Sequence, residues 1–204
     1  EGVYDFAWLD RFFALLEKRK IRVLLCTPTA VPPLWAVERY PEILPVMEDG
    51  RTLGFGKRRY TCLTSPAYRR LSEEVSAAMA AHYAKNPIVL AWQLDNEIGH
   101  PFCFCDRCLT LFREWCERRF KTVAAYNDAL CLHFWGQTVT SFAQIQFPPP
   151  SDHPGLWNLY HAFMSDVTVD LYGTQADIIR ALSPAPVTTN MMLSMRMGGA
   201  NILI

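Results

Sequence analysis

The sequence lacks an excess of charge of either sign. Its 204 residues include 20 Lys and Arg and 20 Asp and Glu, so the formal net charge is zero. This balance excludes a protein that binds nucleic acid or an anionic membrane mainly by electrostatic attraction. Long hydrophobic runs are missing too, since none approaches the roughly 18 residues of a membrane span. Half of the residues are nevertheless hydrophobic and 13% are aromatic, which excludes a disordered tail and indicates one globular domain, or part of one.

Several functional motifs are also absent. The sequence contains no G-x-G-x-x-G and no G-x-x-x-x-G-K, which disfavours a nucleotide-binding open sheet. It contains no H-x-E, H-E-x-x-H or G-x-S-x-G either, which disfavours zinc deaminases, metalloproteases and α/β-hydrolases. The chain does not begin with Met, so we expect the true N-terminus to be missing and draw nothing from the lack of a signal peptide.

The seven cysteines are unevenly distributed. Cys103, Cys105 and Cys108 lie within six residues, and Cys62 lies about 40 residues upstream. Four thiolates can close a tetrahedral site around Zn²⁺, and because they leave no open coordination position such a zinc is structural. The alternative is four small buried hydrophobic residues. An odd number of cysteines and a core rich in aromatic residues favour a reducing compartment, the cytoplasm, over a disulfide scaffold. For Cys26, Cys116 and Cys131 we predict core positions.

Hydrophobic periodicity predicts alternating helices and strands. Ser65-Pro66 is a typical helix start, with Ser as N-cap and Pro at the first helical position; Leu71, Val75, Ala78, Met79 and His82 form the predicted inward stripe of that helix. Helices are predicted over residues 5–20, 66–86, about 106–120 and about 156–182, and strands over 21–26, 88–94 and 187–192. Apolar strands separated by helices imply parallel βαβ units, in an open sheet or a (β/α)8 barrel.

Polar residues follow each predicted strand. Thr27-Pro28-Thr29 follows the first, Asp95-Asn96-Glu97 the second, and Asn190 lies in the third. A carboxylate at the C-terminal end of a barrel strand is placed for general acid/base chemistry, and an adjacent Asn can bind a sugar hydroxyl. The alternative for Glu97 is an ordinary solvated loop residue.

Other residues near these loops are less specific. Lys57 and Arg59 are interpreted as solvated surface charges. The five aromatic side chains nearby could stack on sugar faces or pack in the core; they are Trp35, Phe55, Tyr60, Phe102 and Phe104.

Taken together, these segments resemble glycoside hydrolase family 42, the β-galactosidases. The resemblance extends over nearly the whole chain. It is carried by Thr27-Pro28-Thr29-Ala30, Pro32-Pro33, Trp35, Tyr40-Pro41-Glu42, Gly56 to Tyr60 and Cys62, Trp92 to Glu97 with Gly99, the three clustered cysteines, Phe112-Arg113, Trp115, Tyr126-Asn127, Phe134 to Gln137, and Thr188-Thr189-Asn190. The residues after Asn190 depart from the expected pattern.

The resemblance implies a (β/α)8 TIM barrel, present here as a partial barrel (about strands 2–5), with residues 1–204 forming one partial catalytic domain and Cys62 with 103–108 its zinc-binding loop region. It implies hydrolysis of terminal β-D-galactosides with retention of configuration, often by homotrimers. Glu97 matches the general acid/base, Arg58 and Asn96 match substrate-binding residues, and four cysteines match structural zinc ligands: Cys62, Cys103, Cys105 and Cys108.

Retention requires a second carboxylate as nucleophile. In the family that Glu lies at the end of strand seven, and no Glu follows Glu117 in this sequence. We therefore expect the nucleophile to lie beyond this chain and the chain alone to be inactive. Two alternatives remain open: another retaining β-glycosidase of the same barrel clan, and a non-catalytic, zinc-stabilised carbohydrate-binding fragment.

Overall fold

The computed structural model of the chain describes residues 2–148 and 153–191. In chain order the elements are α1 (Ala7–Lys18), β1 (Val23–Cys26), α2 (Leu34–Arg39), the 3-10 helix η1 (Pro41–Ile43), α3 (Pro66–Tyr83), β2 (Val89–Gln93), α4 (Asp106–Phe120), α5 (Val123–Ala129), the 3-10 helices η2 (Phe134–Gly136) and η3 (Phe142–Gln144), α6 (Pro154–Leu182) and β3 (Val187–Thr188). The predicted strand end at residue 192 and the segment after it lie outside the described residues.

The three strands form one parallel sheet in the order β1-β2-β3. Leu25 pairs with Trp92, and Gln93 pairs with Thr188. Past β3, a single parallel bridge joins Ile98 to Met191. The predicted parallel arrangement is therefore confirmed, although β3 is shorter than expected.

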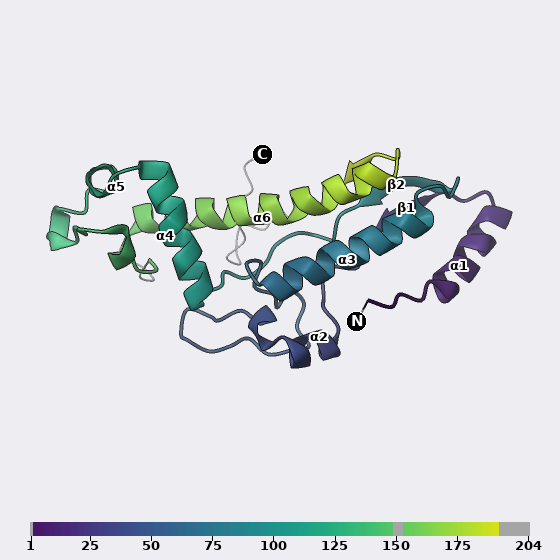
Figure 1. Cartoon of the computed structure of the whole chain (residues 1–204), viewed down its shortest axis with the longest axis horizontal. Helices are drawn as coiled ribbons and strands as arrows, with labels where there is room; N and C mark the ends of the chain where they lie inside the picture. The colour runs from purple at the N-terminus through teal and green to yellow at the C-terminus, as the bar shows by residue number, and fades with distance from the viewer. Residues whose placement is uncertain (1, 149–152, 192–204) are drawn as a thin grey trace.

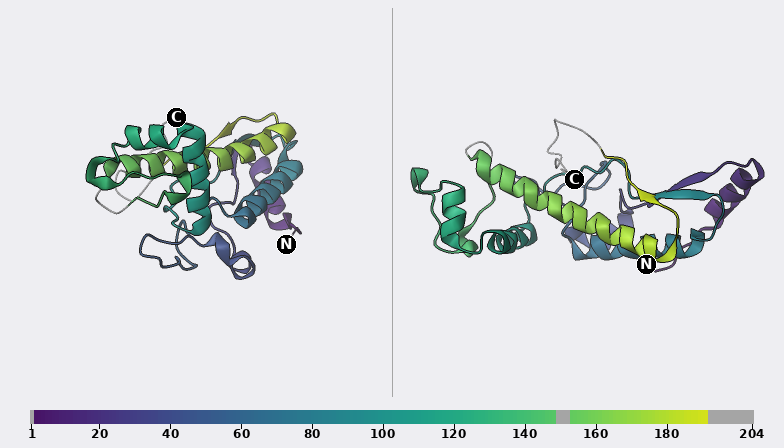
Figure 2. Two further views of the ribbon diagram at one scale, coloured as in Figure 1. Left: turned by 60° about the vertical axis from the view of Figure 1, so that its left-hand side comes forward. Right: turned by 90° about the horizontal axis from the view of Figure 1, so that it is seen from above.

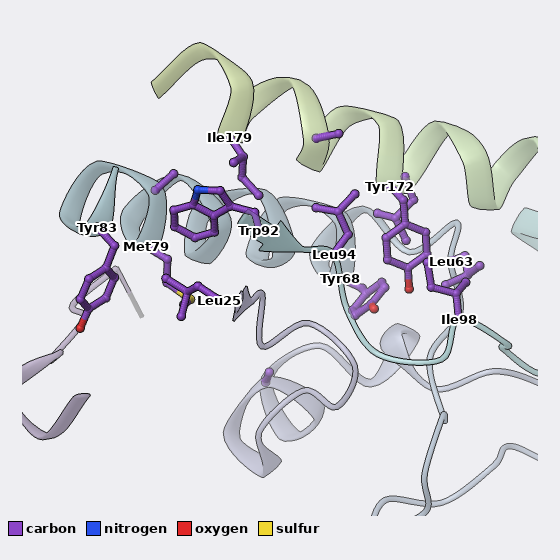
Figure 3. Packing of buried hydrophobic residues seen from close by; sticks show 14 of the residues in the cluster. Leu25, Leu63, Tyr68, Met79, Tyr83, Trp92, Leu94, Ile98, Tyr172 and Ile179 are labelled. Carbon is purple, nitrogen blue, oxygen red and sulfur yellow. The ribbon is translucent and has the colours of Figure 1, made fainter. Parts of the chain in front are cut away.

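Helices α3 and α6 lie side by side, as Figure 1 shows, and share one hydrophobic core with the sheet. Leu25 and Trp92 are buried in this core (Figure 3). Leu24 alternates to the opposite face of β1 and is half exposed, because successive side chains of a strand point to opposite faces.

The start of α3 follows the predicted cap, since the Ser65 hydroxyl accepts a hydrogen bond from the Tyr68 amide at 3.3 Å. The buried stripe of α3 is different from the predicted one. Of the five predicted residues only Met79 is buried, and His82 is exposed. The buried residues of α3 include Ser72 and Ser76 beside Tyr68, Met79 and Tyr83. Ser76 donates to Gln175 of α6 at 3.4 Å. The face of α3 that contacts α6 therefore includes a small polar residue, Ser76.

Helix α1 forms as predicted but buries a narrower face. Phe13 is buried, whereas Phe12 is 51% exposed. Trp8 and Leu15 are exposed as well. The apolar side chain of Phe12 thus lies on the outward face of α1.

Helix α6 spans two hydrophobic clusters. At 29 residues it is about 44 Å long, and Figures 1 and 2 show it running from the sheet to α4. Its C-terminal half packs on the sheet, and its N-terminal half packs with Phe112 and Trp115 of α4 in a second cluster. Within residues 2–148 and 153–191, no helix combines the length and the hydrophobicity needed to cross a membrane.

Candidate functional site

The C-terminal ends of the three parallel strands bring the predicted polar residues together. Thr27 and Thr29 follow β1, Asp95 to Glu97 follow β2, and Asn190 follows β3. Asn190 bridges two of these segments: its Oδ1 accepts from the Glu97 amide at 2.9 Å, and its Nδ2 donates to Asn96 Oδ1 at 3.1 Å. Residues separated by more than 90 positions in sequence thus meet at one edge of the sheet.

The segment after β2 has an unusual backbone. Asp95 and Glu97 have φ values of 52° and 50°, in the left-handed region that non-glycine residues rarely adopt. Each such residue costs on the order of 1 kcal/mol, and the surrounding structure must supply it. The left-handed turn at 95–97 therefore sends the two carboxylates into different environments, one buried and one at the open edge.

Asp95 is fully buried, and its carboxylate is hydrogen-bonded on both oxygens. Arg59 Nη1 donates to Oδ1 at 2.6 Å, while Tyr172 OH and Thr29 Oγ1 donate to Oδ2 at 2.7 and 3.2 Å. A buried charge is tolerable only when it is paired and hydrogen-bonded in this way. Arg59 Nε and Nη2 are buried and have no partner among the described residues.

A buried hydrogen-bonded chain continues from Tyr172. His100 Nε2 lies 2.8 Å from Tyr172 OH, and His100 Nδ1 lies 2.9 Å from Thr61 Oγ1. Figure 3 shows Tyr172 of α6 beside Leu63 and Ile98 in the same core. Burial lowers the pKa of His100 to about 4, with the Arg59 charge acting in the same direction. His100 is thus neutral at pH 7.

Glu97 lies at the open edge, with its side chain 34% exposed. Its carboxylate Oε2 contacts Arg58 Nη2, from the loop before α3, in an ion pair. Asn96 is partly buried beside it. The structure therefore brings together the three predicted site residues Arg58, Asn96 and Glu97.

The four predicted metal ligands also come together. The sulfur atoms of Cys62, Cys103, Cys105 and Cys108 all lie within 4.8 Å of one another. Cys62 Sγ is 3.7 Å from Cys108 Sγ and 4.0 Å from Cys105 Sγ. Four ligands at 2.3 Å from a tetrahedral Zn²⁺ stand about 3.8 Å apart, whereas a disulfide needs about 2.05 Å. The sulfur geometry fits a metal ion and does not fit disulfides.

The remaining cysteines follow the core prediction only in part. Cys116 is buried, and burial raises its pKa to about 12. Cys26 is half-buried beneath the turn at 95–97, where its thiol donates to the Asp95 carbonyl. Cys131 is exposed, so its predicted core position is wrong.

One other sequence prediction is wrong. Arg59 is not a solvated charge, because its side chain is 8% exposed and pairs with Asp95. Among the nearby aromatic residues, Tyr60 and Phe102 are core residues, whereas Trp35 and Phe55 are more than 40% exposed.

The buried network of Asp95, Tyr172 and His100 was not predicted from the sequence. Asp95 stood in the predicted motif without a role of its own, and Tyr172 is 77 residues away in sequence. A signal existed only for Asp95, as a carboxylate directly after an apolar strand. Nothing local marks His100 or Tyr172.

No described cavity is lined by Arg58, Asn96 or Glu97, although Thr29 lines one cavity and His100 another. One of about 700 Å³ lies between α4, α6 and the start of α3, lined by four arginines and two aspartates among other residues. Neither Glu97 nor Arg58 nor Asn96 lines it, so the hydrogen-bonded groups at the strand ends are the better candidate for chemistry.

Comparisons with known proteins give a consistent result. The family profile described as glycoside hydrolase 42, β-galactosidase, matches residues 1–202. The chain is 39% identical over 198 residues to a β-galactosidase of Thermus thermophilus, covering 94% of this chain and 31% of that protein. It is 38% identical over 185 residues to β-galactosidase BgaH of Haloferax lucentense, covering 88% of this chain and 28% of that protein. The chain spans about 30% of the length of the curated relatives it matches.

Solved structures agree. The crystal structure of a β-galactosidase from Bacillus circulans sp. alkalophilus superimposes with a TM-score of 0.90 at 33% identity, covering 94% of this chain and 30% of that one. A β-galactosidase from the Antarctic haloarchaeon Halorubrum lacusprofundi gives a TM-score of 0.89 at 37% identity, over 94% and 30% of the two chains. The three-stranded parallel sheet is thus part of a (β/α)8 TIM barrel.

Proposed function

Because this chain belongs to glycoside hydrolase family 42, the β-galactosidases, we propose that it contributes the general acid/base of a retaining glycosidase that hydrolyses terminal β-D-galactosides. One observation carries the assignment of Glu97. Of the two carboxylates in the turn after β2, Asp95 is buried and fully hydrogen-bonded, whereas Glu97 is partly exposed at the open edge of the strands. Active sites of (β/α)8 barrels are built at that edge.

In the proposed reaction Glu97 acts twice. As a protonated acid it donates its proton to the glycosidic oxygen while a second carboxylate attacks the anomeric carbon, so that the glycosidic bond breaks as the new C–O bond forms. As a carboxylate it then removes a proton from water, whose oxygen displaces the second carboxylate and releases the sugar. Two inversions give net retention.

We assign substrate binding to Arg58 and Asn96. Arg58 is 60% exposed and contacts Glu97, and a guanidinium beside a carboxylate favours its ionised form. The first step needs the protonated form. A sugar hydroxyl that accepts the Arg58 hydrogen bonds would draw the guanidinium away from Glu97 and so favour proton donation. Asn96, oriented by Asn190 at 3.1 Å, would bind a hydroxyl close to the reacting centre.

The second carboxylate must stand about 5–5.5 Å from Glu97. Asp95 cannot serve, because it is buried and ion-paired with Arg59. We therefore propose that the nucleophile comes from a barrel strand other than β1, β2 and β3, and that the chain in isolation is inactive.

We propose zinc as the metal for the four cysteines, with residues 1–204 as one partial barrel domain and the loop region of Cys62 and 103–108 as its metal-binding part. Zinc bound by four thiolates has no free coordination position and would hold loops together rather than activate water. None of the seven cysteines forms a disulfide, which supports a reducing compartment such as the cytoplasm, and the family resemblance supports a homotrimer.

The test uses the protein expressed from its complete gene, as wild type and as Glu97→Ala, with an activated aryl β-galactoside. We expect the substitution to lower turnover by about 10² to 10⁴ and azide to restore it, with β-galactosyl azide as product, because azide needs no general base. Glu114→Ala, at an exposed position of α4, is the matched control and should keep wild-type activity.

Equal activity of wild type and Glu97→Ala would refute the assignment of the acid/base. Cleavage of a different aryl glycoside in preference to the galactoside would leave the assignment as a glycosidase in place but would show that the substrate carries a different sugar. Sugar binding without cleavage of any aryl glycoside would indicate a binding function.

A further inference from the structure

The turn at 95–97 presents Glu97 through backbone that does not adopt this conformation by default. Two of its three residues have left-handed φ values, so the direction of the Glu97 side chain depends on whatever holds Asp95. Hydrogen bonds from neighbouring side chains hold the backbone amide and carbonyl of Asp95. Its amide donates to Thr27 Oγ1 at 2.8 Å, and its carbonyl accepts from Gln93 Nε2 at 2.9 Å.

The Asp95 carboxylate supplies the remaining support. It accepts from Arg59 of the loop before α3, from Tyr172 of α6, from Thr29 after β1, and from the amide of Asn96 within the turn. Four parts of the chain thus converge on one side chain that lies two residues from Glu97. Since the Asn96 amide belongs to the turn, the carboxylate fixes the backbone between Asp95 and Glu97 directly.

The hydrogen atoms of the network have only one consistent arrangement around Tyr172. Tyr172 OH donates to Asp95 Oδ2. The Tyr172 oxygen then accepts from His100 Nε2, and neutral His100 accepts from Thr61 through Nδ1. Every group in the series has a defined role as donor or acceptor, which fixes the Tyr172 hydroxyl in place.

We propose that Asp95 is a positioning residue for Glu97, and that Tyr172, oriented by His100, holds the Asp95 carboxylate in the position that keeps the left-handed turn. This inference rests on the proposed function. Asp95 touches no substrate in this role, and it acts through the direction of the Glu97 carboxylate alone. A displacement of about 1 Å at a reacting group can cost about 100-fold in rate.

The experiment separates proton donation from the rest of the reaction. In 2,4-dinitrophenyl β-galactoside the dinitrophenolate is a good leaving group and departs without protonation. The phenolate of phenyl β-galactoside is a poor leaving group and needs a proton from the general acid. The variant is Tyr172→Phe in the complete gene product, which removes one hydroxyl and keeps the ring. The matched control is Tyr83→Phe, since Tyr83 is also buried and donates to an aspartate, Asp10, at 2.8 Å.

We expect Tyr172→Phe to lower kcat/KM about tenfold for phenyl β-galactoside and less than about threefold for the dinitrophenyl substrate. Asp95→Asn should show the same selectivity at about 100-fold. Tyr83→Phe should change neither rate. A role in general stability would lower the amount of active enzyme and hence lower the apparent kcat/KM for both substrates equally.

If Tyr172→Phe lowered kcat/KM equally for both substrates, or lowered it for neither, the positioning role would be overturned. In those cases wild type would still cleave both galactosides and Glu97→Ala would still be impaired and rescued by azide, so the proposed function would stand. A wild-type protein that cleaves neither substrate would refute the proposed function, and this inference with it.

Discussion

The turn at 95–97 and the four-cysteine cluster are joined by the same loop but are stabilised in opposite ways. Arg58 and Arg59 of this loop contact the turn, and Cys62, three residues later, belongs to the cluster. The turn is held by ordinary hydrogen bonds and a buried ion pair that the chain supplies itself. The cluster gathers four sulfur atoms within 4.8 Å with no cationic side chain among its four members.

This difference indicates that the four-cysteine cluster needs a bound cation, whereas the turn does not. Thiols are weak hydrogen-bond donors, so contacts between them contribute little, and thiolates this close together repel one another. A bound cation converts that repulsion into attraction. Asp95 needs no such component because Arg59, Tyr172 and Thr29 already satisfy its charge.

The largest expected effect is therefore at the cluster. Replacing one ligand, Cys108→Ser, should abolish stoichiometric zinc and lower the unfolding midpoint strongly, because structural zinc contributes on the order of 10 kcal/mol. Metal analysis by mass spectrometry and thermal unfolding measure the two effects. Cys116→Ser is the control: it is equally buried but outside the cluster, and should keep one zinc per chain. Unchanged zinc content in Cys108→Ser would contradict the assignment of the ligand.

An intermediate effect is expected at the turn. Arg59→Met leaves the buried Asp95 carboxylate without its countercharge, and we expect it to reduce the free energy of unfolding by about 3–5 kcal/mol. Arg59→Met combined with Asp95→Leu removes both charges and should recover part of that loss. Urea denaturation measures both. The exposed pair of Arg180 and Asp177 provides the control, since Arg180→Met should change stability little. An equally small effect of Arg59→Met would show that the turn does not depend on this pair.

The smallest of the three effects depends on pH. The folded state lowers the pKa of His100 to about 4 from 6.5, so between these values the unfolded chain binds more protons than the folded chain. Stability should therefore fall as the pH is lowered from about 6.5 to about 4, by about 3 kcal/mol from this residue, and should be flat from this residue above pH 6.5. Denaturation curves at pH 7 and pH 5 for wild type and His100→Gln measure it. The same slope in both proteins would assign the pH dependence to other groups.

The sequence predicted the elements whose signals are local. Ser65-Pro66 marks the start of α3 through a cap that involves only Tyr68 three residues later, and the spacing of the three clustered cysteines already indicates a common ligand. The position of Glu97 follows from an apolar strand that ends in polar residues. Each of these features depends on neighbours within a few positions.

The failed predictions concern burial that depends on distant partners. Arg59 and Lys57 belong to the same charged run, yet Arg59 is buried because Asp95, 36 residues later, offers it a carboxylate. The inward stripe of α3 was misplaced because α6 contacts this helix at Ser76, outside the predicted stripe, and Cys131 was placed in a core that does not reach it. Hydropathy patterns describe how apolar a face is but not which helix covers it.

The sequence by itself determined the parallel alternation of strands and helices, the clustered cysteines and the pair Asn96 and Glu97, because periodicity, capping and motif spacing are local properties of the chain. Arg58 was identified only through the family resemblance. Only the tertiary structure decided which of the two carboxylates after β2 is buried and which is partly exposed. That choice depends on the left-handed turn, which exists because Arg59, Thr29 and Tyr172 from three other parts of the chain hold Asp95 inside.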